Sequence, residues 1–147
     1  MDPARVAALE RRLDLRFRDR ALLERALTHA SYAHEHPPVA DHEPLALLGD
    51  AALGLVVADH LFQEDPRAPV GALTARRAAL VSGANLARWA AELDLGALLR
   101  LGRGEELSGG RTRASILATA LEAVLGVVYL EGGLPAVRRV VARLALW

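Results

Sequence analysis

The sequence has no cysteine and no lysine, and only 4% of its 147 residues are aromatic. The absence of cysteine excludes a disulfide framework and any thiolate metal site. The formal net charge is +0, because 18 arginines balance 18 acidic residues. Nucleic-acid binders often carry a basic excess, so any such binding here must use a local arginine patch. The arginine-only usage fits either a composition bias or phosphate recognition by guanidinium groups.

Length and hydropathy indicate one folded domain over residues 1–147, because a chain that is 52% hydrophobic can bury a real core. The N-terminus, from Met1 to Ala4, lacks the basic-then-apolar layout of a signal peptide. The longest apolar stretch, residues 114–130, carries Glu122 near its centre, which argues against a membrane span. We therefore expect a cytoplasmic protein without a membrane partner.

The hydrophobic periodicity predicts an all-α fold, because valine and isoleucine lie inside helical repeats and do not alternate with polar residues. Asp19 and Ser82 are expected to cap helices, and Gly132 and Gly133 to end one before Pro135 opens the next. Helices are predicted over residues 3–13, 19–30, 45–62, 71–81, 82–93, 114–130 and from 135 onward. Loops are predicted over residues 34–38, 66–69 and 102–110.

Two isolated carboxylates lie in the two most apolar predicted helices. Asp50 is the only charged residue between Pro44 and Val57, and Glu122 is the only one in residues 114–130. Both are expected to be buried on most sides, where an unpaired carboxylate costs several kcal/mol. One interpretation is a structural ion pair with arginine. The other is a metal or acid–base site assembled between two helices.

The motifs around these carboxylates resemble those of the ribonuclease III family over nearly the whole chain. Residues 42–51, HEPLALLGDA, are similar to the family signature N-E-R-L-E-F-L-G-D-A. Residues 27–32, LTHASY, resemble its L-T-H-x-S-Y motif, and residues 101–110 its glycine loop. Residues 115–133, from Ser115-Ile116-Leu117 to Glu131-Gly132-Gly133, resemble its second catalytic helix. The family's double-stranded-RNA-binding domain is expected to be absent, since the sequence stops at Trp147.

This resemblance implies an all-helical ribonuclease III endonuclease-domain bundle, a symmetric homodimer and Mg²⁺-dependent cleavage of double-stranded RNA. In the family, four carboxylates from two facing helices hold metal ions that activate water and stabilise charge on the phosphate. Positions 46 and 50 are four residues apart and positions 119 and 122 three apart, so each pair shares one helix face.

The sequence departs from the family at these positions. The family's glutamate falls at Ala46 and its aspartate at Thr119, so only Asp50 and Glu122 remain of the four. Glu43, the first glutamate of the signature, survives, and Val70 stands where an acidic residue is common. A methyl group cannot coordinate and a threonine hydroxyl is a poor ligand, so Mg²⁺ binding by Asp50 and Glu122 is predicted to be weak or absent. Hydrolysis through the remnant set is therefore predicted to be impaired or lost.

Arginines bracket the glycine loop and are the candidate RNA-binding residues: Arg100, Arg103, Arg111 and Arg113. Glycines let backbone amides approach phosphates and arginine adds forked donors. The alternative is an ordinary solvated loop in which Glu105 and Glu106 offset half the charge. Arg76 and Arg77 are either a second phosphate contact or a helix surface, with the surface favoured.

Leu47 stands where the family has an aromatic residue that packs across the dimer, so a homodimer is predicted through the helix at 45–62. The five histidines fit no metal cage by spacing and are assigned to loops and caps, with a structural hydrogen bond for His29.

Three functions follow. The first is a catalytically defective ribonuclease III-like protein that binds double-stranded or structured RNA, or a ribonucleoprotein partner, as a dimer. The second is an active short-form Mg²⁺-dependent endonuclease for RNA processing. The third is a heterodimer subunit of an intact ribonuclease III chain.

Overall fold

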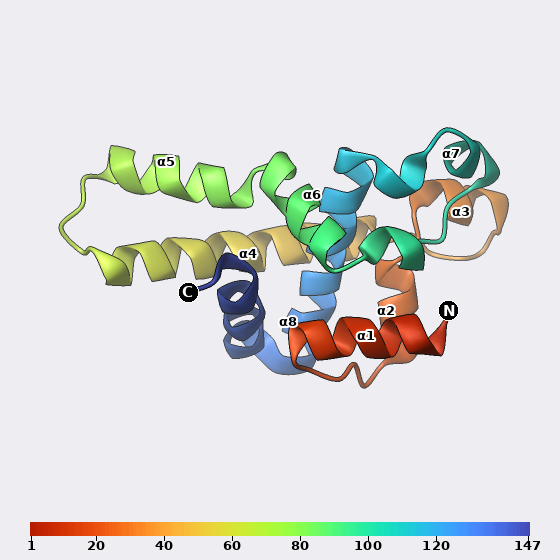
Figure 1. Cartoon of the computed structure of the whole chain (residues 1–147), viewed down its shortest axis with the longest axis horizontal. Coiled ribbons are helices and arrows are strands. Elements are labelled where there is room, and N and C mark those ends of the chain that lie inside the picture. Colours follow the sequence, from red (N-terminus) through yellow and green to blue (C-terminus); the bar gives the residue numbers. More distant parts are fainter.

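The computed structural model describes residues 1–147 and contains helices with no strand (Figure 1). This confirms the predicted all-α class. The α-helices are α1 (Pro3–Leu13), α2 (Arg20–Ala26), α3 (Ala30–Glu35), α4 (Glu43–Glu64), α5 (Val70–Val81), α6 (Gly83–Glu92), α7 (Arg103–Leu107) and α8 (Ala114–Ala145). Two short 3₁₀ helices complete the set: η1 (Leu95–Leu98) and η2 (Gly110–Thr112).

Helices α4 and α8 cross at the centre of the molecule, where their backbones touch at two glycines. A Cβ atom on Gly49 would lie 1.7 Å from the backbone oxygen of Glu122, and one on Gly126 would lie 2.3 Å from that of Leu45. No side chain fits between the helices at this point. The crossing therefore fixes the register of α4 against α8, and with it the placement of residues 50 and 122.

The hydrophobicity of these two helices is explained by their burial. By length and composition alone, both α4 and α8 are apolar enough to cross a membrane. In the structure 50% of the apolar window of α4 and 61% of that of α8 is buried inside the fold. Core helices of this kind pass the same composition test as membrane spans.

Predicted caps and breaks define several helix ends. The side chain of Asp19 accepts a hydrogen bond from the backbone amide of Leu22, and Ser82 accepts one from Asn85. Each satisfies an amide that the first helical turn leaves without a partner. Helix α8 is kinked at Gly133, whose φ of 68° only glycine adopts easily, and Pro135 follows within the next turn. The predicted caps at Asp19 and Ser82 and the break at Gly132–Gly133 are thus confirmed.

Two short helices differ from the prediction. The helix expected to reach Ala30 ends at Ala26, and α3 extends into residues predicted as loop. The backbone leaves the helix because Arg100 donates its amide to Leu27 at 2.8 Å and accepts that of His29 at 3.0 Å. Helix α7 lies within the predicted loop 102–110. Both helices are too short to produce a clear periodic pattern.

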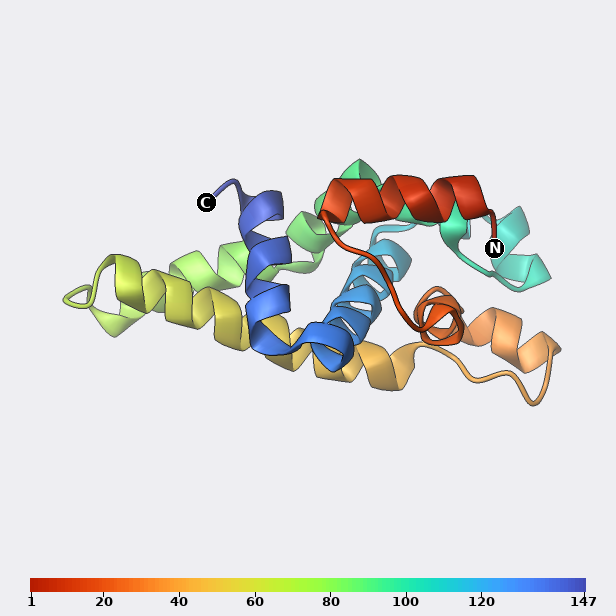
Figure 2. The same cartoon turned by 90° about the horizontal axis from the view of Figure 1, so that it is seen from below.

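The α4–α5 hairpin extends beyond the rest of the molecule (Figure 1). No residue of α5 is buried, although Leu73, Leu80 and Val81 pack partly against the core. Figure 2 shows α4 along one side of the molecule, with no other element over its outer face.

Candidate active site at the crossing of two helices

The helix crossing brings Asp50 and Glu122 together. Asp50 follows Gly49, whose backbone abuts the carbonyl of Glu122. Burial, followed by hydrogen bonding to Asp50 and the charges of Asp50 and Glu43, together raise the pKa of Glu122 to about 7. Asp50 therefore lies next to Glu122, and Glu43 lies near enough for its charge to act on Glu122. The structure brings Asp50 and Glu122 together, with Glu43 nearby and not part of a three-carboxylate cluster.

The prediction that Asp50 and Glu122 are both buried on most sides is wrong for Asp50. Glu122 is half-buried, but Asp50 is exposed and not enclosed. Position 50 lies on the flank of α4, beside the face that contacts α8, so its carboxylate reaches solvent. Neither carboxylate forms an ion pair with arginine, so the structural ion-pair interpretation does not describe them. A solvent-accessible carboxylate beside a half-buried one is an arrangement that can meet a ligand.

The positions of the missing family carboxylates offer no replacement ligand. Ala46 is only 6% exposed and contributes a methyl group. The hydroxyl of Thr119 donates to the backbone oxygen of Ser115 at 2.9 Å. Val70 is an exposed hydrophobic residue at the start of α5. No group of three or more histidine, aspartate or glutamate side chains has the geometry of a metal site.

These residues do not fit the multi-carboxylate metal cluster that the family resemblance implies. The most that the remaining donor set offers is one Mg²⁺ held by Asp50 and Glu122, completed by water and substrate phosphate.

Three of the four predicted RNA-binding arginines have partners within the chain. Arg100 pairs with Glu24 at 2.8 Å, donates to the hydroxyl of Thr28 and lies over the ring of Tyr32, 4.6 Å from its centroid. These contacts tie the residue to α2 and α3. Its guanidinium therefore has a structural role, whether or not RNA also approaches it.

The glycine loop is held by two further arginines. Arg111 pairs with Glu106 at 2.6 Å and also donates to the backbone oxygens of Gly96 and Leu99. Arg113 pairs with Glu105. Sequence spacing gave a partial signal here, since both glutamates lie within eight residues of their arginines.

Arg103 differs from these three. Its backbone amide donates to the carboxylate of Glu35, and its guanidinium makes no hydrogen bond or ion pair within the chain. RNA binding by the four arginines stays a prediction. Arg103 is the one of the four whose guanidinium has no partner within the chain.

The histidines near the site are structural. His29 caps α3, its Nδ1 accepting from the backbone amide of Ser31 at 3.1 Å, as predicted. His42, predicted to lie in a loop or cap, occupies the N-cap position of α4 without a capping hydrogen bond from its side chain; its ring is fully buried beside Ala26, and this burial lowers its pKa. A neutral His42 therefore supports the start of α4.

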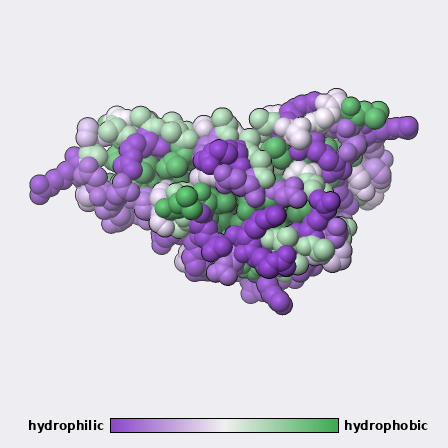
Figure 3. Space-filling view, viewed as in Figure 1, coloured by the Kyte–Doolittle hydropathy of each residue, from purple (hydrophilic) through white to green (hydrophobic).

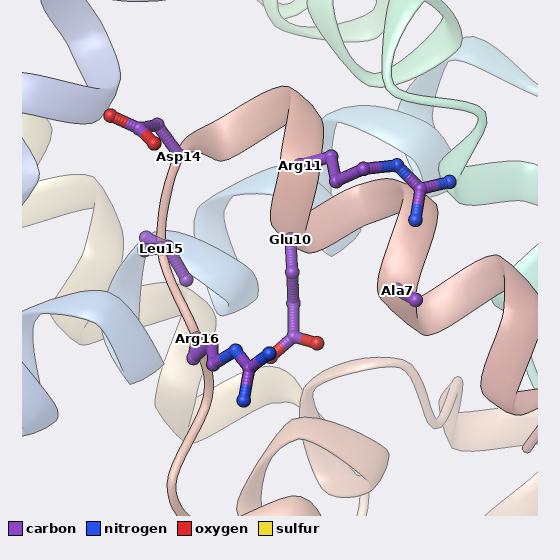
Figure 4. A pocket seen from close by; sticks show the side chains of 6 residues that line it. All are labelled: Ala7, Glu10, Arg11, Asp14, Leu15 and Arg16. Atoms are coloured by element: carbon purple, nitrogen blue, oxygen red, sulfur yellow. The ribbon is translucent and has the colours of Figure 1, made fainter.

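A separate hollow of about 450 Å³ lies along α1 and the following loop (Figure 4). Its mostly buried carboxylate, Glu10, accepts from the backbone amide of Phe17 at 2.8 Å and pairs with Arg20 at 3.2 Å. Glu10 thus fastens the loop between α1 and α2. The α4–α8 crossing, by contrast, carries the carboxylates that have no internal cation.

Comparisons with known proteins agree with the fold and the motifs. A family model described as Ribonuclease-III-like matches residues 19–146. Ribonuclease 3 of Heliobacterium modesticaldum is 51% identical over 144 residues, which cover 97% of this chain and 61% of that protein. Ribonuclease 3 of Caldanaerobacter subterraneus is 48% identical over 134 residues, covering 90% of this chain and 59% of that protein.

Among solved structures, the nuclease domain of ribonuclease III from Campylobacter jejuni has 38% identity and a TM-score of 0.89, and the match covers 98% of this chain and 94% of that one. The chain belongs to the ribonuclease III-like family. It spans about 60% of the length of the curated relatives it matches.

Proposed function

We propose that this protein associates with double-stranded or structured RNA as a homodimer, and that its ability to hydrolyse RNA is impaired or lost. The observation that carries this proposal is the composition of the helix crossing. Asp50 and Glu122 lie together there with Glu43 nearby, while Ala46 and Thr119 supply no metal ligand. The fold of a ribonuclease III nuclease domain is thus retained around a reduced donor set.

The expected loss of activity follows from metal chemistry. A divalent cation that activates water and neutralises charge on a transferring phosphate needs a fixed set of anionic ligands. Removing two carboxylates takes away two charges and two donors. The raised pKa of Glu122 weakens the set further, because near neutral pH part of its population is protonated and must lose that proton to bind a metal.

Association with RNA is supported by the relatives, which are named Ribonuclease 3. The uncommitted guanidinium of Arg103 beside the glycine loop is a suitable phosphate donor. Since the net charge is +0, binding must depend on such local groups.

The outer face of α4 supports a homodimer. Leu47 is 75% exposed, and Leu55 and Phe62 are more than half exposed on the same helix. A shallow apolar hollow of about 190 Å³ lies beside them, lined by Leu48, Ala51, Ala52, Leu55, Tyr129 and Leu134. The visible face in Figure 3 is mainly hydrophilic, with small apolar areas. A continuous apolar stripe on one helix is typical of an interface. One Campylobacter jejuni structure is described as showing flexibility in a region involved in dimer formation.

A second candidate is an active Mg²⁺-dependent endonuclease in which Asp50, Glu122 and Glu43 hold a single metal with substrate phosphate. The names of the relatives and the proximity of Asp50 to Glu122 favour it. This candidate requires that Asp50→Asn or Glu122→Gln abolish cleavage of double-stranded RNA. Cleavage that survives both changes excludes it.

A third candidate is a non-catalytic subunit in a heterodimer with an intact ribonuclease III chain, or in a ribonucleoprotein. The exposed stripe on α4 suits either partner. A tagged copy that retrieves a second ribonuclease III chain from cells supports the heterodimer, and retrieval of itself alone supports the homodimer.

The proposal is tested by measuring RNA binding and cleavage on the same sample. Fluorescence anisotropy with labelled duplex RNA is expected to show binding in EDTA as well as in Mg²⁺, with no cleavage on a denaturing gel. Absence of binding in both buffers overturns the RNA association. Rapid Mg²⁺-dependent cleavage overturns the predicted defect.

A further inference from the structure

Arg77 of α5 lies against α4 in an unusual way. Its guanidinium covers Gly54, and a Cβ atom there would lie 3.0 Å from Nη2, 3.8 Å from Cζ and 3.9 Å from Nε. Three atoms of the planar group are thus close to one backbone position. Gly54 is buried beneath a side chain that is itself exposed. The lack of a side chain at residue 54 is what allows this approach.

The guanidinium of Arg77 has no partner inside the protein. It makes no hydrogen bond or ion pair, whereas the neighbouring Arg76 pairs with Glu64 at 2.8 Å. Glu64 also accepts a hydrogen bond from His60, so the two adjacent arginines differ in their surroundings. A guanidinium carries five donors in a fixed fork. Those of Arg77 lie over Gly54 of α4 and remain available to a ligand.

The guanidinium of Arg77 covers the same face of α4 that carries Glu43 and Asp50. Gly54 is four residues beyond Asp50 and eleven beyond Glu43, which places all three on one face of α4. One helical turn separates residues 50 and 54, a rise of about 6 Å. Arg77 thus adds a cation to the edge of a site whose own side chains are acidic.

We propose that Arg77 binds the RNA phosphodiester backbone next to the Asp50–Glu122 pair, and that Gly54 positions its guanidinium for this contact. The inference rests on the proposed RNA association. A phosphate entering the crossing meets the carboxylates, and in a site short of metal ligands no firmly held cation offsets their repulsion. A guanidinium that lies one helical turn away supplies that charge and two parallel donors.

The first test compares Arg77→Met with Arg76→Met in binding duplex RNA, in EDTA, over a series of salt concentrations. Both changes remove one charge from the same helix and leave an unbranched apolar side chain in place of the arginine. Loss of the Arg77 contact is expected to weaken binding about five- to tenfold. The slope of the logarithm of the binding constant against the logarithm of the salt concentration is expected to become shallower by about one. Arg76→Met is expected to change binding less than twofold, which is about the size of a remote charge effect.

The second test is Gly54→Ala, which leaves every charge in place. The new methyl group would lie 3.0 Å from Nη2 at the end of the Arg77 side chain, so the helix is retained while the guanidinium shifts by a few tenths of an ångström. Binding is expected to weaken, by less than in Arg77→Met because the charge is kept, and the double variant is expected to be no weaker than Arg77→Met alone. Circular dichroism and urea unfolding verify that each variant is folded.

The outcomes separate the two proposals. If the unaltered chain binds RNA and Arg77→Met binds as tightly, or if both arginine variants weaken binding equally, the role of Arg77 is overturned while RNA association stands. Unchanged binding by Gly54→Ala overturns the positioning by Gly54. If the unaltered chain binds no RNA in any buffer, the proposed function and this inference both fail.

Discussion

Replacing Glu122 with glutamine is expected to remove a specific pH dependence of stability. Burial, together with Asp50 and Glu43, raises the pKa of Glu122 from 4.5 to about 7. Between these values the folded chain holds a proton that the unfolded chain has released, so the free energy of unfolding falls as the pH rises from 4.5 through 7. Below pH 4.5 this contribution is fully present. Glutamine mimics the protonated carboxyl and removes the effect.

The expected size follows from the separation of the two pKa values. Each pH unit of separation corresponds to about 1.4 kcal/mol when a group is fully protected from solvent. Because Glu122 is only half-buried, screening lowers the expected total to about 1–2 kcal/mol. Glu122→Gln should therefore resemble the unaltered protein at pH 5 and exceed its free energy of unfolding by about this amount at pH 8.

Urea unfolding followed by circular dichroism at both pH values measures this difference. Glu92→Gln is a suitable control, since Glu92 is exposed and pairs with Arg88 on the surface. Its stability should differ from that of the unaltered chain by the same small amount at pH 5 and pH 8. If Glu122→Gln shows an equal offset at both pH values, the burial of Glu122 and its proximity to Asp50 and Glu43 have been misjudged.

Two further changes test the crossing and the exposed face. Gly49→Ala places a methyl group 1.7 Å from the backbone oxygen of Glu122 and is expected to lower the free energy of unfolding by about 3 kcal/mol or to prevent folding, whereas Gly71→Ala meets nothing and is expected to be neutral or stabilising. Leu47→Arg is expected to yield monomers in analytical ultracentrifugation, whereas Leu107→Arg, equally exposed on α7, should leave the dimer intact; a Leu47→Arg dimer would contradict the assignment of this interface.

The long elements were predictable because their signals are local. The apolar stretches that became α4 and α8, the caps Asp19 and Ser82, and the break at Gly133 all follow from composition and backbone chemistry within a few residues. Convergence of Asp50 and Glu122 was also predictable, since a charge in an apolar helix needs an exposed flank or a partner.

Features that depend on tertiary contacts were not predictable. The end of α2 is set by hydrogen bonds to Arg100, more than 70 residues away along the chain. Exposure of Asp50 depends on how α8 crosses α4, which periodicity does not specify. The packing of Arg77 over Gly54 joins two helices, and the sequence, which favours a helix surface for Arg76 and Arg77, does not distinguish one arginine from the other.

The central claim is that the fold of a ribonuclease III nuclease domain is retained here while two metal-binding positions are lost. The most direct test is cleavage of a long double-stranded RNA in Mg²⁺ and then in Mn²⁺, by the unaltered chain and by the double variant Ala46→Glu/Thr119→Asp. The account predicts that the unaltered chain leaves the RNA intact and that the double variant cuts it. Comparable cleavage by the unaltered chain would contradict it, because the metal would then be held by ligands other than those at positions 46 and 119.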